Sequence, residues 1–242
     1  MPTLVDHAFL ALFVVVVPLI GLMRMSKLKK LIEADQPGLR VAIYTQTMVT
    51  QWALLAGLVA IWIVQDRSAA VLGVTTPRGV VFWVAIVVIL AGAAYLLREA
   101  AQTRRDKKKA QKVLEQIESV DELLPHTKRE LHWFYGLSVT AGICEEILYR
   151  GFMFWWVTAL GGGVWMAVAA SAIGFGLGHV YQGVAGAAKI AALGAVFAAL
   201  YWITESIWAP ILAHILLDIV SGATAHAALC NQQPELDTAP AS

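Results

Sequence analysis

Three charged residues interrupt an apolar stretch of the chain, AGICEEILYRGFMFWW at residues 141–156. Glu146 and Arg150 are four residues apart, so on a helix they share a face and can form an ion pair. Glu145 points about 100° away from that pair, toward a different neighbour. A carboxylate that the pair leaves free, in a site where water is scarce, can act as a general base.

Two histidines follow downstream, each within four residues of a potential partner. Phe175 and His179 share a helical face in FGLGHV, and His214 and Asp218 share one in HILLDIV. An aspartate one turn away can hold an imidazole in one tautomer or keep it protonated. The three stretches together supply one base, two histidines and an orienting acid, a set suited to acid–base hydrolysis.

Each of these residues also has a purely structural interpretation. Glu146 and Arg150 fit a helix-packing contact, Phe175 fits a packing residue, and a membrane histidine can hydrogen-bond a carbonyl of a neighbouring helix. A charge near the bilayer centre costs about 2.5–3.5 kcal/mol on insertion scales, so such groups usually face a protein interior or a cavity. The ionisable residues of the apolar C-terminal half are Glu145, Glu146, Arg150, His179, Lys189, Glu205, His214, Asp218 and His226. Six of these nine lie in the three stretches, and this clustering favours one functional site.

The composition indicates which elements must position these residues. Of the 242 residues, 59% are hydrophobic and 14% charged, whereas an ordinary soluble domain has about 45–50% and about 25%. Residues 41–64 and 79–97 contain no Asp, Glu, Lys or Arg and reach the roughly 20 residues that cross a bilayer. The sequence therefore predicts an all-α, polytopic transmembrane helical bundle of about seven or eight spans. We expect spans near 4–23, 41–64, 79–97, 133–160, 164–181, 184–204 and 207–229.

The basic residues predict the orientation of the bundle. Of the 18 Lys and Arg, 14 lie in residues 24–40 and 98–129, and the positive-inside rule places such segments in the cytoplasm. The N-terminus has no basic region before its apolar run and no cleavage site, so we expect a retained first span with an outside N-terminus. We expect an integral protein of a bacterial cytoplasmic (inner) membrane.

Residues 98–129 form a highly charged segment with apolar positions at helical spacing, namely Val113, Leu114, Ile117, Val120, Leu123 and Leu124. The spacing predicts an amphipathic helix on the cytoplasmic surface. Two interpretations remain open: a solvated basic loop that only fixes topology, or a surface that binds anionic lipid head groups.

The stretches EEILYR (145–150), FGLGH (175–179) and HILLD (214–218) resemble, in order and spacing, three motifs of the CAAX prenyl protease family, also called CPBP or Abi: EExxxR, FxxxH and Hxxx(N/D). The resemblance covers roughly residues 133–228. It implies an intramembrane endopeptidase that hydrolyses a peptide bond with glutamate-activated water, near the C-terminus of a lipidated or membrane-associated peptide.

The resemblance also implies a role for each residue. Glu145 activates water and His179 helps to hold it, while His214 and Asp218 stabilise the oxyanion. Glu146, Arg150 and Phe175 support the site structurally. Studied relatives carry asparagine at the last motif position, and an ionised aspartate can only accept hydrogen bonds. We therefore expect Asp218 to hold His214 as an imidazolium, which is a stronger donor to developing negative charge.

Cofactors and partners follow from the same resemblance. It implies a metal-free mechanism, and the H-E-x-x-H zinc signature is absent. Because Glu145, His179, His214 and Asp218 could also ligate zinc, a zinc site remains a minority alternative. The expected partners are a peptide or lipidated-protein substrate and the bilayer, including anionic lipids, but no nucleic acid. A non-enzymatic scaffold or bacteriocin-immunity protein is the alternative function, ahead of a proton-coupled transporter.

Three regions are expected: N-terminal helices and a basic amphipathic segment at 1–130, a catalytic CPBP-like core at 131–230, and a polar disordered tail at 231–242. Trp155, Trp156, Trp165 and Trp202 fit interfacial anchors or a groove for a lipidated peptide. Counted along straight spans, His179 lies nearer the cytoplasm and His214 nearer the outside. One helix must therefore be offset, tilted or interrupted if the motif residues are to meet.

Overall fold

The computed structural model describes residues 1–33, 38–117 and 123–232, and within these ranges its regular elements are all helical. The predicted polar tail lies almost wholly outside the described residues. The helices are α1 (Leu4–Ala11), η1 (Leu12–Val16), α2 (Val17–Glu33), α3 (Leu39–Val64), η2 (Ala69–Leu72), α4 (Gly79–Thr103), α5 (Lys107–Ile117), α6 (Lys128–Glu146), η4 (Ile147–Met153), α7 (Phe154–Ala159), α8 (Val164–Gly178), η5 (Val180–Gln182), α9 (Gly183–Thr204) and α10 (Trp208–Gln232).

Five helical segments in the described part are long and apolar enough to cross a membrane: Leu4–Arg24, Leu39–Val64, Gly79–Thr103, Val180–Thr204 and Trp208–Gln232. The prediction of an all-helical membrane bundle is confirmed, and the protein is an integral membrane protein. Two predicted spans differ from this pattern. Helix α8 is apolar but has only 15 residues, and the fourth predicted span is the interrupted run α6–η4–α7.

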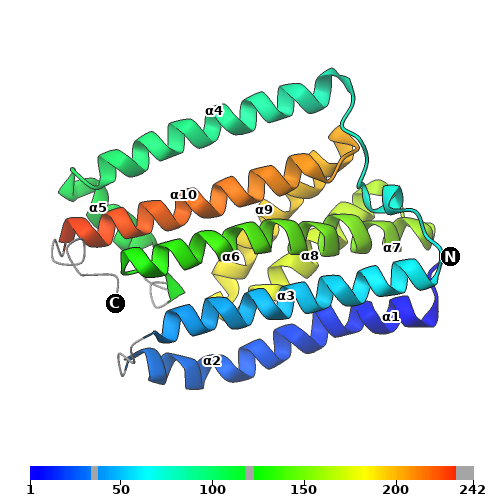
Figure 1. The fold of residues 1–242 in the computed structure, drawn as a ribbon, viewed down its shortest axis with the longest axis horizontal. Helices are drawn as coiled ribbons and strands as arrows, with labels where there is room; N and C mark the ends of the chain where they lie inside the picture. The colour runs from blue at the N-terminus through cyan, green and yellow to red at the C-terminus, as the bar shows by residue number, and fades with distance from the viewer. Residues whose placement is uncertain (34–37, 118–122, 233–242) are drawn as a thin grey trace.

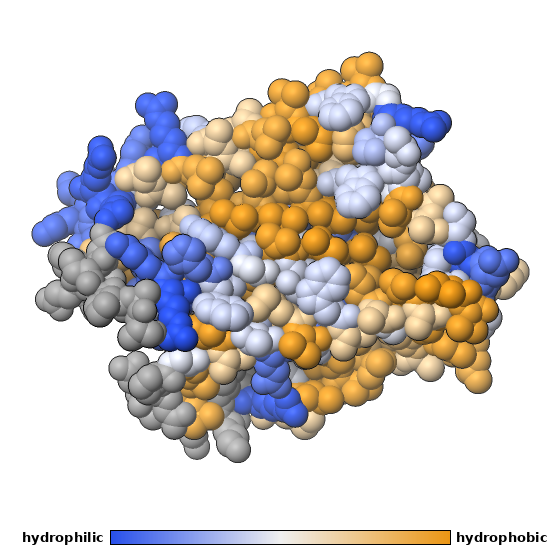
Figure 2. Space-filling model, viewed as in Figure 1, coloured by the Kyte–Doolittle hydropathy of each residue, from blue (hydrophilic) through white to orange (hydrophobic). Residues whose placement is uncertain are grey.

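The long helices α3, α4, α6 and α10 run side by side, whereas α8 and α9 form a hairpin that is inclined to them (Figure 1). Helix α6 packs against both α3 and α10, and α8 packs against α9. An apolar band crosses the middle of the molecule, and hydrophilic residues gather toward the ends of the helices (Figure 2). This distribution is the one that a bilayer requires of a spanning bundle.

Local sequence explains where the central run of helix begins and changes. Thr127 and Glu130 form a capping box at the start of α6, in which Thr127 Oγ1 accepts from the Glu130 N–H and the Glu130 carboxylate accepts from the Thr127 N–H. Such a box satisfies donors that a helix start leaves unpaired. After Glu146 the helix widens into the π-helical segment η4. The predicted fourth span is thus a continuous helical run with a local widening at its centre.

The core around η4 is aromatic and joins it to the N-terminal helices. Phe152 is fully buried between Phe9, Phe13 and Trp62, which belong to α1, η1 and α3. Edge-to-face aromatic pairs of this kind add about 0.5–1.5 kcal/mol beyond the burial of their area. The element that follows the two glutamates is thus held on one side by helices from outside the motif region.

Helix α5 confirms part of the predicted amphipathic segment. Its apolar positions Val113, Leu114 and Ile117 are partly buried and its buried residue is Ala110, and the helix packs against α10 and α4. Val120, another predicted apolar position, lies outside the described residues. The apolar face of this helix is therefore covered in large part by the protein itself, while Lys107, Lys108 and Lys112 are exposed.

The tryptophans divide between two environments. Trp155 packs edge-on against Trp62, and Trp156 Nε1 donates to His7 Nδ1 at 3.1 Å, so both contact the N-terminal helices. Trp165 and Trp202 are exposed and pack against each other with ring centroids 5.8 Å apart. An exposed tryptophan pair of this kind fits interfacial anchors.

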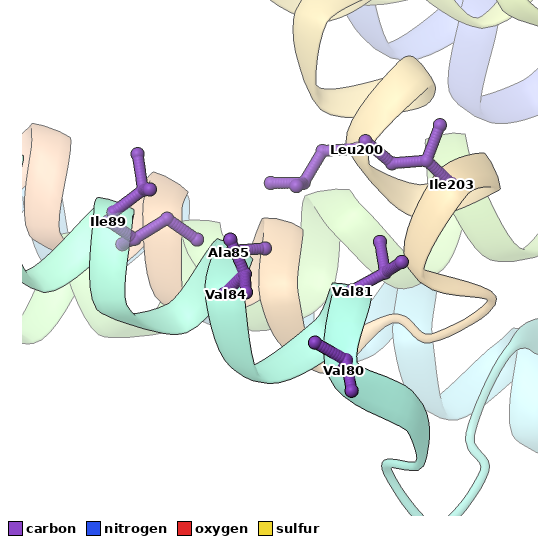
Figure 3. Close-up of a pocket in the computed structure, with 8 residues that line it drawn as sticks. Val80, Val81, Val84, Ala85, Ile89, Leu200 and Ile203 are labelled. Atoms are coloured by element: carbon purple, nitrogen blue, oxygen red, sulfur yellow. The ribbon is translucent and has the colours of Figure 1, made fainter.

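An apolar groove of about 410 Å³ opens between α4 and α9 (Figure 3). It is lined by Val80, Val81, Val84, Ala85, Val88, Ile89, Leu200 and Ile203. Only aliphatic side chains line it, so it belongs to the lipid-facing surface of the bundle and offers no group for acid–base chemistry.

Candidate active site

The second glutamate of the pair, Glu146, is fully buried and joins two helices. Its Oε1 accepts from Arg150 Nη1 at 2.9 Å and from His214 Nδ1 at 2.7 Å. The predicted ion pair between Glu146 and Arg150 is therefore present, and it extends across the α6–α10 interface to the third motif. Gly142, one turn earlier, permits this approach, since a Cβ there would lie 3.1 Å from the Ile215 backbone nitrogen.

Arg150 is also fully buried, at the centre of the π-helical segment. Its Nη2 donates to the Gly194 carbonyl of α9 at 3.1 Å, and its guanidinium lies 4.3 Å from the centroid of the Phe175 ring. A side chain at position 194 would lie 3.2 Å from that Nη2. Arg150 therefore connects η4 to both helices of the α8–α9 hairpin, and the absence of a side chain at Gly194 leaves room for its guanidinium.

His214 is the seventh residue of α10 and lies between two carboxylates. Its Nδ1 donates to Glu146, whereas its Nε2 is 3.6 Å from Asp218 Oδ2, too far for a hydrogen bond. The ring stacks on Phe197, with centroids 5.4 Å apart, and meets the edge of Phe175 at 5.8 Å. Glu146 and the two aromatic rings thus orient His214, while its Nε2 edge stays available toward the partly exposed Asp218.

His179 stands at the C-terminal end of α8, where the helix gives way to a short turn. Its Nδ1 contacts the Phe175 carbonyl at 2.8 Å, and because a carbonyl only accepts, this nitrogen carries a proton. In a neutral ring the other nitrogen, Nε2, is then the acceptor. The ring lies 4.9 Å from Phe175, which contacts Arg150, His179 and His214 together.

Glu145 faces away from the buried ion pair, as its spacing predicts. Its Oε1 accepts from Gln51 Nε2 of α3 at 2.6 Å, and its Oε2 is buried without a hydrogen-bond partner in the protein. His179, His214 and Asp218 all lie within electrostatic range of this carboxylate. One oxygen of Glu145 is thus fixed, and the other remains free to accept a proton.

The structure brings the three motifs together, although straight spans would separate their histidines. Helix α8 is only about 22 Å long at 1.5 Å per residue and is inclined (Figure 1), so that His179 ends its helix beside Phe175 and His214. In the described ranges, no three His, Cys, Asp or Glu side chains lie close enough together to hold a metal ion.

Two contacts were not expected from the sequence: the bond from Gln51 to Glu145 and the bond from His214 to Glu146. Gln51 is a polar residue in a stretch without charges, and a polar side chain in a membrane span usually faces a protein interior. That signal marks Gln51 as a candidate, but it does not name its partner. The partner depends on how α3 packs against α6.

These features define a helical integral membrane protein with a buried glutamate–histidine site. Residues 127–220 match the sequence model of a family described as type II CAAX prenyl endopeptidase, Rce1-like. The match spans all three motifs and confirms the resemblance found in the sequence: residues 127–220 are similar to the Rce1-like family, a family of peptide hydrolases. No curated protein and no solved structure matches the chain.

Proposed function

We propose that the protein is an intramembrane endopeptidase of the CAAX type, in which Glu145 is the general base. The observation that carries the proposal is the state of its carboxylate: Oε1 is held by Gln51, while Oε2 is buried and unpartnered, within electrostatic range of both motif histidines. A buried polar atom without a partner calls for a functional or structural explanation. In the proposed mechanism, Oε2 accepts a hydrogen bond from the water molecule that Glu145 deprotonates, and this explains the unpartnered atom.

In the proposed step, Glu145 Oε2 takes one proton from a water molecule while the water oxygen attacks the carbonyl carbon of the peptide bond. His179 Nε2 accepts a hydrogen bond from the same water and fixes its direction. The resulting tetrahedral intermediate collapses with cleavage of the C–N bond. Glu145 then returns the proton to the leaving amine, so the base is regenerated.

His214 meets the negative charge that develops on the carbonyl oxygen. Its Nδ1–H bond to Glu146 orients the ring, and its Nε2–H is the proposed donor, with Asp218 Oδ2 at 3.6 Å as an ion-pair partner rather than a hydrogen-bond partner. A donor fixed in advance where charge develops contributes typically 10²- to 10³-fold to the rate. Glu146 and Arg150 therefore serve as positioning residues for the oxyanion donor, and Phe175 packs the two histidines and the arginine together.

The proposed substrate is a peptide that reaches the site from the membrane, lipidated or membrane-associated near its C-terminus. The basic residues of α5 and of the start of α6 lie at one end of the bundle with the end of α10 (Figure 1). We assign this end to the cytoplasm by the positive-inside rule. The N-terminus then lies outside.

Cleavage of a peptide panel by purified protein in detergent tests this function. The panel contains peptides with and without a lipidated C-terminal cysteine. We expect cleavage by the wild type to be unchanged by a chelator and to fall by roughly 10²- to 10⁴-fold in Glu145→Gln, the usual contribution of a general base. Glu115→Gln, at an exposed position of α5, is the matched control.

Full cleavage by Glu145→Gln would refute the assignment of the base. Retention of full activity by that variant in cells, with no peptide cleaved in vitro, would favour the scaffold alternative. Loss of cleavage on addition of the chelator would place a metal ion in the mechanism.

A further inference from the structure

Gln51 contacts the proposed base from outside the three motifs and outside the Rce1-like segment. It lies midway along α3, and its Nε2 donates to Glu145 Oε1 at 2.6 Å, a short bond to a charged acceptor. An amide nitrogen can only donate and an ionised carboxylate can only accept, so the orientation of the Gln51 amide is determined. The amide oxygen of Gln51 therefore points elsewhere.

The face of α3 that carries Gln51 is the face that packs into the bundle. Leu55, Leu58 and Trp62 follow it at helical spacing and are buried, and the neighbouring Trp52 donates from Nε1 to Thr140 Oγ1 of α6 at 3.3 Å. These contacts fix the register between α3 and α6 next to Glu145. A glutamine on such a stripe replaces an apolar side chain, and its amide costs free energy unless it is paired.

Only half of that amide is paired within the protein. Gln51 Oε1 is buried and has no hydrogen-bond partner, and the same holds for Glu145 Oε2. Both atoms are acceptors, so they cannot pair with each other. A peptide that enters a site with little water brings backbone N–H groups, each of which needs an acceptor. The unfilled oxygen of Gln51 has the chemistry to meet one of them.

We propose that Gln51 is a further residue of the active site, with a different role at each end of its amide. Its N–H group holds Glu145 Oε1, so that Oε2 is the oxygen that takes the proton from water. Its carbonyl oxygen accepts a hydrogen bond from a backbone N–H of the peptide substrate, beside the bond to be cleaved. This inference rests on the proposed function and extends it to a helix of the N-terminal region.

Two substitutions separate the two roles in steady-state kinetics. Gln51→Leu removes both the donor and the acceptor, so we expect kcat to fall by roughly 10- to 100-fold, as a hydrogen bond to a charged group predicts, together with a rise in KM. Gln51→Glu keeps acceptor oxygens but places a second carboxyl group beside Glu145, where the two share a proton. We therefore expect a similar fall in kcat at neutral pH, partly recovered at higher pH, with KM close to that of the wild type. Gln46→Leu, at an exposed position of the same helix, should leave both constants unchanged.

A stability cycle tests the contact without relying on activity. We expect the sum of the two Tm losses in Gln51→Leu and Glu145→Ala to be larger than the Tm loss in the double variant. The reason is that the two residues share one interaction, which each single substitution already removes. Strictly additive losses would overturn the proposed contact, even if the wild type cleaved none of the peptides and the proposed function had failed. With an active wild type and an inactive Glu145→Gln, a kcat of Gln51→Leu within twofold of the wild type would overturn the role of Gln51 alone.

Discussion

Asp6 and Glu146 are both fully buried carboxylates paired with an arginine, but they differ in how many of their oxygens accept hydrogen bonds. Asp6 Oδ1 accepts from Arg67 Nη1 at 2.8 Å, and Oδ2 accepts from Arg67 Nη2 at 2.7 Å and from Thr3. The guanidinium of Arg67 lies between Trp62 and Trp155, 4.8 and 4.4 Å from their ring centroids. Both oxygens of Asp6 are thus paired, and 14% of the Arg67 side chain is exposed.

The pair at the site is built differently. Glu146 uses Oε1 for both Arg150 and His214, while its Oε2 and the Nε of Arg150 have no hydrogen-bond partner. Its neighbour Glu145 likewise keeps one oxygen free. A buried charge alone therefore does not identify chemistry in this bundle. The two pairs differ in that each carboxylate of the site keeps one buried oxygen without a partner, whereas both oxygens of Asp6 are paired.

The same substitution at the two arginines gives the largest expected effects and tests this contrast directly. Arg67→Leu and Arg150→Leu should each lower the free energy of unfolding by about 3–5 kcal/mol, because each leaves a buried carboxylate without its partner. Only Arg150→Leu should also lose cleavage per folded molecule, since only Arg150 holds Glu146 and the α8–α9 hairpin in place. Denaturant unfolding in detergent, with kcat measured below both transitions, checks the two quantities.

If Arg150→Leu does not fold, Glu146→Gln replaces it as the milder change, because it keeps the shape of the side chain. Equal loss of kcat in folded Arg67→Leu would break the contrast, since the outer pair would then contribute to catalysis as well as to stability.

His214→Gln should have the next largest effect, and it should fall on kcat more than on stability. We expect kcat to fall by roughly 10²- to 10³-fold through loss of the oxyanion donor. The free energy of unfolding should fall by about 1–3 kcal/mol, because Glu146 keeps its bond to Arg150. His226→Gln, on the same helix and also buried, is the matched control and should leave kcat unchanged. A normal kcat in His214→Gln would remove His214 from the proposed mechanism.

The sequence predicted the helices well because apolar length and glycine turns determine them locally. The α8–α9 hairpin, predicted at 164–181 and 184–204, occupies Val164–Gly178 and Gly183–Thr204. The sequence also predicted the ion pair of Glu146 and Arg150, because both residues lie on one continuous helical run. The π-helical segment was not predicted, since the spacing of apolar residues does not distinguish a local widening from a regular helix.

The contacts between distant helices could not be predicted from spacing. Asp6 and Arg67 lie 61 positions apart, Glu146 and His214 68, and Gln51 and Glu145 94. Each depends on the register in which two helices pack, and no periodicity of a single helix encodes it. The motif resemblance supplied part of this information, because it implied that the three stretches meet. It could not name Gln51, which lies outside the motifs.

Asp218→Asn is expected to have the smallest effect and tests which carboxylate orients His214. The sequence suggested Asp218, but the structure places Glu146 at hydrogen-bonding distance from the ring and Asp218 at 3.6 Å, with 35% of the Asp218 side chain exposed. Partly exposed pairs typically contribute about 0–1 kcal/mol, so kcat should change by less than about fivefold, and the free energy of unfolding should hardly change. A loss in Asp218→Asn as large as that in His214→Gln would show that Asp218, despite its distance in this structure, holds the imidazole during the reaction. Near-normal kinetics would leave Glu146 as the residue that couples the first motif to the third.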